Sequence, residues 1–139
     1  METNRTDSPQ RRIIDNAFNQ GDLAALDDLL SVDGIEHHDQ HRTTPSKNGL
    51  KGVVAMFRGG FADLHVTVDD EIREGDKVAT HFTIRGTHTG LFLGNPPTGK
   101  RVAVPGILFA RNENGRMKES WTVVDNMGMM QQLGLVPPP

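Results

Sequence analysis

The spacing of apolar residues changes halfway along the chain, and this change constrains the fold more than any other feature of the sequence. Up to about residue 62, apolar side chains recur every three or four positions, which is typical of helices that bury one face. From residue 64 onward they alternate with polar side chains, which is typical of half-buried strands. The order predicts an α+β fold in which N-terminal helices pack across one face of a curved, cone-shaped antiparallel sheet.

Three helices are expected before the sheet: one that begins at Pro9 and ends at Gly21, a short one after Asp22, and one over about residues 48–62. Ser8 and Pro9 suit the N-cap and the first position of the first helix. Phe57 and Phe61 belong to the apolar face of the third helix. A short extended segment is expected around residues 35–38.

Strands are expected over about residues 64–72, 78–88, 101–111 and 119–125, followed by a closing helix at about 126–133. The chain has 139 residues, enough for one core but not for two. We therefore expect a single domain over residues 1–139, with residues 1–7 and 136–139 as flexible tails.

The composition narrows the possible partners. A net charge of −3 offers no basic surface for nucleic acid, and no segment is apolar enough for a signal peptide or a membrane span. The absence of cysteine excludes disulfides and thiolate chemistry. We therefore expect a cytoplasmic protein that binds neither nucleic acid nor membrane.

The last expected strand places a carboxylate beside the single tryptophan. Strand alternation puts Asp125 on the same side as Glu119, Trp121 and Val123. A carboxylate that is partly removed from water takes up a proton more readily, which suits a general acid or base at neutral pH. Asp125 can also cap the helix that follows, and the two roles can coexist.

Three blocks of sequence occur in a characteristic order: GTHTGLFLGNPPTGK at 86–100, Glu119-x-Trp121-x-x-x-Asp125, and MMQQLG at 129–134. With upstream segments that also fit, nearly the whole chain resembles the SnoaL-like polyketide cyclase (ester cyclase) family. The resemblance implies the cone-shaped α+β fold of the nuclear transport factor 2-like superfamily. It also implies subunits that pair through the sheet, as a homodimer or a homotetramer.

The same resemblance implies an activity. The best-known members close a ring in a polyketide methyl ester by intramolecular aldol condensation, without a metal or an organic cofactor. Their general acid/base is an aspartate at the position that matches Asp125. A C–H flanked by carbonyls stabilises its own carbanion, so such a protein has only to supply a positioned base and a dry pocket. The expected ligand is a small apolar metabolite with a carbonyl group.

Other residues complete the predicted site. His38 matches a histidine at the mouth of the cone, and His81 lines the cavity if its side of the strand faces inward, which alternation alone does not decide. The expected substrate-binding residues are Trp121, Glu119, Phe57, Phe61, Ile107 and Phe109. No metal site is expected, because the cluster of Glu36, His37, His38, Asp39 and His41 has no recognised zinc spacing.

Two alternatives to a cyclase stay open. The cone fold also hosts epoxide hydrolysis by paired aspartates joined by an arginine, and Arg85 with Asp125 would be the nearest approach to that set. The other alternative is a domain that binds a small molecule without reacting with it. An enzyme should hold its acid inside a closed cavity, whereas a binding domain tolerates it at the surface.

Overall fold

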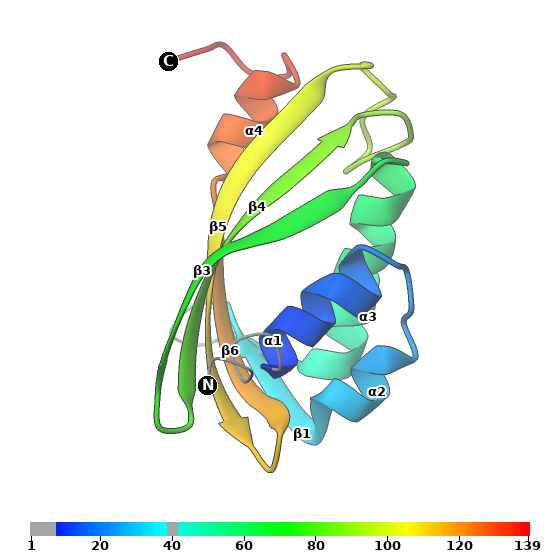
Figure 1. Cartoon of the computed structure of the whole chain (residues 1–139). Helices are drawn as coiled ribbons and strands as arrows, with labels where there is room; N and C mark the ends of the chain where they lie inside the picture. Colours follow the sequence, from blue (N-terminus) through cyan, green and yellow to red (C-terminus); the bar gives the residue numbers. More distant parts are fainter. Residues whose placement is uncertain (1–7, 39–41) are drawn as a thin grey trace.

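A strongly curved sheet forms the body of the protein, and the N-terminal helices pack against its inner face (Figure 1). The computed structural model describes residues 8–38 and 42–139. The helices are α1 (Pro9–Arg12), the π-helix η2 (Ile13–Phe18), α2 (Ala25–Leu29), α3 (Ser46–Gly60) and α4 (Asn126–Gln132). The strands are β1 (Leu30–His37), β2 (Thr43–Pro45), β3 (His65–Glu74), β4 (Lys77–Thr87), β5 (Arg101–Glu113) and β6 (Arg116–Val124).

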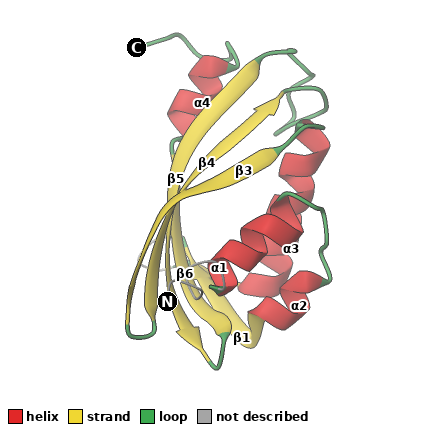
Figure 2. Ribbon diagram, viewed as in Figure 1, coloured by secondary structure: helices red, strands yellow, loops and turns green. Residues whose placement is uncertain are grey.

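The predicted α+β architecture is confirmed, with one difference in the sheet. The strand order is β2-β1-β6-β5-β4-β3, and every neighbouring pair is antiparallel except β1 and β6, which run parallel. A parallel pair requires a long connection, and here that connection contains α3 and the four strands β2, β3, β4 and β5. The strand β1 therefore comes before α3 in the sequence, yet it lies beside β6, the last strand of the chain, in the sheet (Figure 2).

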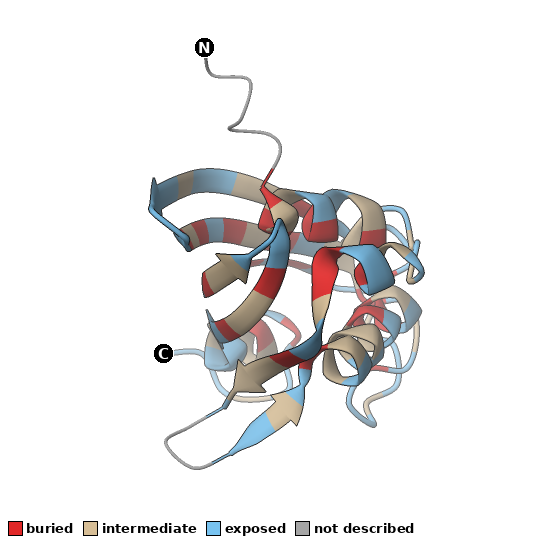
Figure 3. Ribbon diagram, turned by 90° about the horizontal axis from the view of Figure 1, so that it is seen from below, coloured by how far each residue is buried: buried red, intermediate tan, exposed pale blue. Residues whose placement is uncertain are grey.

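Alternation along the strands decides which side chains meet the helices. On β5, every second residue from Val102 to Ala110 is buried, including Gly106, whereas the residues between them are exposed. Figure 3 shows this alternation of buried and exposed residues along the strands. The inner face packs against Val54 and Phe57 of α3 and forms one core with the helices.

The first helix differs from the expected single α-helix. Ser8 is its N-cap, as predicted, and accepts a hydrogen bond from the Arg11 amide at 3.0 Å. After one turn the helix widens into η2, where the Asn19 amide donates to the Ile14 carbonyl at 3.0 Å. The Asn19 side chain accepts from Val66 N at 2.7 Å and donates to Val66 O at 2.9 Å. The end of η2 is thereby fixed to the edge strand β3.

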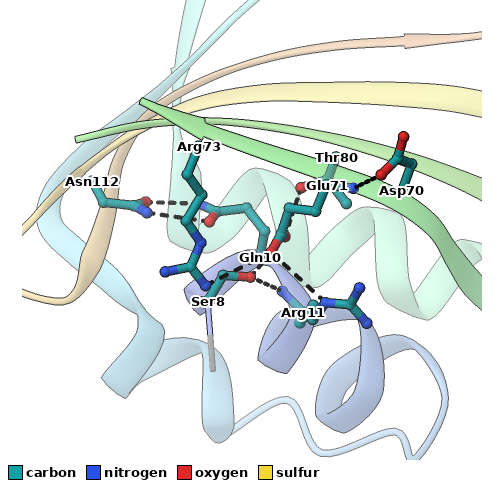
Figure 4. A network of polar contacts seen from close by, with 8 residues as sticks. All are labelled: Ser8, Gln10, Arg11, Asp70, Glu71, Arg73, Thr80 and Asn112. Atoms are coloured by element: carbon teal, nitrogen blue, oxygen red, sulfur yellow. Dashed lines mark hydrogen bonds and ion pairs between the residues drawn. The ribbon is translucent and has the colours of Figure 1, made fainter. Parts of the chain in front are cut away.

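A network around Glu71 fastens α1 to the sheet (Figure 4). The nearly buried Glu71 carboxylate accepts hydrogen bonds from Ser8 Oγ at 2.8 Å and from Thr80 Oγ1 at 3.1 Å. Nitrogens of Arg11 and Arg73 lie 3.7 Å from its other oxygen. This network sets the position of α1, and with it the position of η2.

The helix α4 protects an otherwise free edge of β5. The pairing of β6 with β5 reaches only Gly106, and beyond that point the Gln132 side chain bonds to both backbone groups of Ala103 at 2.7 and 3.0 Å. None of the described helices is long and apolar enough to cross a lipid bilayer.

Candidate active site

A cavity of about 210 Å³ lies between the inner face of the sheet and the helices. Most of its wall is apolar. The helical side of the wall is formed by Ile13, Ile14 and Phe18 of η2 and by Leu50, Val53 and Phe57 of α3. The sheet contributes Val66, Phe82, Ile84, Leu108, Met117 and Val124. Such a wall excludes water and favours an apolar ligand.

Four polar side chains gather on one side of this cavity. Glu36 and His38 come from β1 and the residue after it, and Ser120 and Thr122 come from β6. Glu36 and Ser120 are register partners in the parallel pair of β1 and β6, so their side chains lie next to each other on the inner face. Ser120 is buried, whereas His38 and Thr122 are exposed and mark the mouth.

Glu36 is the one carboxylate among the described residues that line the cavity. Its Oε1 accepts a hydrogen bond from Thr44 Oγ1 at 3.4 Å, and Thr44 is its register partner on β2. Burial raises the pKa of the Glu36 carboxyl above its ordinary value, while the charge of His38 and the bond from Thr44 oppose part of this shift. A half-buried carboxylate with a raised pKa in an apolar cavity has the properties of a general base.

Gly49 explains how the carboxylate fits beneath α3. A Cβ atom at this position would lie only 2.3 Å from Glu36 Oε1 and 3.3 Å from Thr44 Oγ1. Glycine inside a helix costs about 1 kcal/mol relative to alanine. We infer that the helix tolerates this cost because any larger residue would displace the carboxylate.

We therefore predict opposite effects of Gly49→Ala on structure and on activity. The added methyl group should favour the helix, yet it should move the Glu36 carboxylate and lower turnover at least about tenfold, since small misplacements of reacting groups have effects of that size or larger. Gly52→Ala is the matched control, because nothing lies within 4 Å of its added Cβ. Equal turnover in the two variants would contradict this role of Gly49.

The structure places Asp125 outside the cavity. Its side chain is exposed and caps α4, accepting a hydrogen bond from the Gly128 amide at 2.9 Å. Asp125, the expected general acid/base, therefore does not line the cavity, because Ser120, Thr122 and Val124 are the β6 residues that do. The helix-capping role is confirmed.

Four predicted substrate-binding residues also lie on the outer face of the sheet, away from the cavity. Trp121 stacks on the His37 ring with centroids 4.4 Å apart, and Glu119 accepts hydrogen bonds from Arg111 at 2.7 Å and from His37 at 3.0 Å. Ile107 and Phe109 pair with Val123 and Trp121 across β5 and β6. These four residues do share one face of the sheet, as predicted, but that face is turned away from the cavity.

The remaining predicted site residues divide between the two faces. Phe57 lines the cavity, whereas Phe61 is buried behind it against Phe92 and His88. His81 is exposed on the outer face, because its neighbours Thr80 and Phe82 point inward. His38 lines the cavity at its mouth.

The histidine cluster does not converge in the part of the chain that the structure describes. His37 points outward to Trp121 and Glu119, while Glu36 and His38 face the cavity. Within residues 8–38 and 42–139, no three acidic or histidine side chains could hold a metal ion together. Asp39 and His41 lie outside the described residues.

The chain is similar to known proteins over most of its length. The protein named nogalonic acid methyl ester cyclase, from Streptomyces nogalater, is 24% identical over 121 residues, which cover 86% of this chain and 90% of that protein. The structure of IdmH from Streptomyces antibioticus, a proposed polyketide cyclase, is 34% identical with a TM-score of 0.79 and covers 91% of this chain and 96% of its own. TsrD from Streptomyces laurentii is 28% identical, with a TM-score of 0.80 over 92% and 93% of the two chains.

These similarities identify both the fold of the protein and its family. The fold is the cone-shaped α+β fold of the nuclear transport factor 2-like superfamily. The sequence model of the SnoaL-like polyketide cyclases matches residues 10–133, and the chain belongs to that family.

Proposed function

We propose that the protein is a cofactor-independent cyclase in which Glu36 is the general acid/base. The observation that carries the proposal is the position of this carboxylate, which faces an apolar cavity and has a raised pKa. Family membership supports ring closure as the reaction class. Among the described lining residues there is neither aspartate nor arginine, so the arrangement needed for epoxide hydrolysis is not found there.

In the proposed reaction, Glu36 removes a proton from a carbon next to a carbonyl group. The electron pair of the broken C–H bond forms an enolate, whose carbon attacks a second carbonyl of the same molecule. The new C–C bond closes the ring, and the alkoxide that results takes up a proton. The apolar wall holds the substrate folded and keeps water out, so the protein needs to supply no further reagent.

The cavity also limits the size of the proposed substrate. Its volume of about 210 Å³ is below the roughly 300–1,000 Å³ of pockets that enclose drug-sized ligands. We therefore propose a polyketide-derived ketone or ester that places one or two rings inside the cavity. The acidic C–H would face Glu36, a carbonyl oxygen would face the Ser120 hydroxyl, and the hydrocarbon part would lie toward Phe57 and Phe82.

Carbon deprotonation can be measured without knowing the natural substrate. The two-ring ketone 2-tetralone carries its most acidic hydrogens between the carbonyl group and the aromatic ring. In D₂O, the protein should bind it and accelerate replacement of these hydrogens by deuterium, which NMR follows directly. Binding without acceleration would indicate a non-catalytic binding domain instead.

The outer face of the sheet supports a further proposal, a homodimer. Four large apolar side chains form a compact patch of two cross-strand pairs, with exposed fractions of 52% for Ile107, 41% for Phe109, 39% for Trp121 and 73% for Val123. A patch of this kind marks an interface. We propose a second copy as the partner, since an exposed apolar patch of this kind can pair with itself across a two-fold axis.

Charge placed on this patch is expected to separate the subunits. The double change Ile107→Lys and Val123→Lys should convert a dimer to a monomer, because lysine charges would have to be desolvated at the interface. Val32→Lys is the matched control, since Val32 is 82% exposed and lies outside the patch. Sedimentation equilibrium gives the mass, and an unchanged dimer in the double variant would refute this interface.

A further inference from the structure

Two polar side chains of the cavity wall are joined through a third residue. His38 Nε2 lies 2.9 Å from Thr44 Oγ1, and Thr44 Oγ1 lies 3.4 Å from Glu36 Oε1. The three residues thus form a chain of hydrogen-bonding groups from the half-buried carboxylate to the exposed imidazole at the mouth.

The sheet holds this chain of groups in place. Thr44 is the register partner of Glu36 in the antiparallel pair of β1 and β2. The His38 amide donates to the Arg42 carbonyl at 2.9 Å, which continues the pairing beyond the end of the strands. On the other side, Gly49 of α3 leaves room for the carboxylate next to the Thr44 hydroxyl.

We propose that Thr44 is a positioning residue that relays protons between Glu36 and His38, and so connects the general base with solvent. The inference rests on the proposed function of Glu36. A base that has taken a proton inside an apolar cavity must lose it again before the next turnover. The Glu36 carboxyl is half-buried beneath Gly49 of α3, whereas His38 is exposed at the mouth of the cavity.

The relay can be written with every proton accounted for. After Glu36 has taken the substrate proton, rotation of its carboxyl group brings that proton to Thr44 Oγ1. The Thr44 hydroxyl passes its own proton to Nε2 of neutral His38. Glu36 is then a carboxylate again and His38 is an imidazolium ion, which gives its proton to solvent or to the alkoxide formed in ring closure.

The distances suit a relay that tightens on binding. The contact of 2.9 Å is a normal hydrogen bond, whereas 3.4 Å is long for an O–H···O bond. Catalytic hydrogen bonds are often long in ligand-free proteins and shorten in the complex.

The experiment compares deuterium exchange into 2-tetralone by the wild type and by Thr44→Val, Thr44→Ser, Thr43→Val and Glu36→Gln. Valine has the shape of threonine without the hydroxyl, so the proton on Glu36 should return to the carbon it came from. We expect Thr44→Val to lower the rate of deuterium exchange at least tenfold at every pH, including the plateau of the pH profile. The dissociation constant for 2-tetralone should be unchanged. Thr44→Ser should stay within about threefold of the wild type, as should the exposed neighbour Thr43→Val.

The possible outcomes separate the two proposals. If Glu36→Gln abolishes exchange but Thr44→Val exchanges as fast as the wild type, the proposed relay is wrong and the assignment of Glu36 as the general base is retained. If the wild type itself produces no exchange, both are wrong. A Thr44→Val variant that loses exchange and binding together would also overturn the relay, since that result indicates a structural role.

Discussion

Replacing Glu36 by glutamine should lower the rate of carbon deprotonation at least about a hundredfold, which is the usual contribution of a positioned general base. Glutamine keeps the size and polarity of the side chain but cannot accept a proton at the cavity wall. The wild-type rate should rise with pH through an acid limb that lies above 4.5, the ordinary value for glutamate, because burial raises the pKa of Glu36. This limb should be absent in Glu36→Gln.

Asp125→Asn is the matched control for this prediction. Asparagine can still cap α4, so the fold should be retained. Because Asp125 lies outside the cavity, its replacement should leave deuterium exchange within about threefold of the wild type. If Asp125→Asn slowed exchange and Glu36→Gln did not, Asp125 would be the general base, as the family resemblance implies.

Replacing Glu71 by alanine should have the largest effect on stability, about 3 kcal/mol less free energy of unfolding. The change leaves Arg11 Nε, which is buried, without its counter-ion and removes the acceptor of Ser8 and Thr80. Urea denaturation measures the loss, and Glu71→Gln, which keeps one acceptor oxygen, should cost less than alanine.

The same change should weaken the binding of ligand. The Glu71 network holds α1 (Figure 4). The helix η2 continues from α1 and contributes Ile13, Ile14 and Phe18 to the cavity wall. A loosened α1 allows this wall to move, so the dissociation constant for 2-tetralone should rise. A Glu71→Ala protein with a free energy of unfolding within about 0.5 kcal/mol of the wild type would show that the network contributes little.

The sequence predicted the fold well because its periodic patterns are local. Four strands and the helices α3 and α4 lie within a few residues of the expected ranges. The change from α-helix to π-helix at Ile13 was not predictable in this way. It accompanies contacts of Asn19 with Val66 on a distant strand, and the periodicity of a short segment contains no information about such contacts.

The site was harder to predict, because alternation shows which residues share a face but not which face encloses the cavity. Trp121 and Val123 gave the outer face of β6 its apolar appearance, while the cavity is lined by the smaller Ser120 and Thr122. Both faces of β6 carry apolar side chains, so hydrophobicity alone cannot show which face packs on the helices.

One signal in the sequence did indicate Glu36. His38 was expected at the mouth of the cone, and in an extended segment the residue two positions before it points to the same side. The same alternation directs His37 outward, where it stacks on Trp121. The partnership of Glu36 with Thr44 and Gly49 depends on the hairpin of β1 and β2 and on the placement of α3, and only the structure shows it.

The central claim is that chemistry takes place in the inner cavity and not on the face that carries Trp121 and Asp125. A crystal structure of the protein with 2-tetralone tests it most directly. We predict the ligand between Phe57 and Glu36, with its acidic C–H toward Glu36 and its carbonyl oxygen toward the Ser120 hydroxyl. A ligand bound against Trp121 and Val123 on the outer face, with the cavity empty, would contradict the claim.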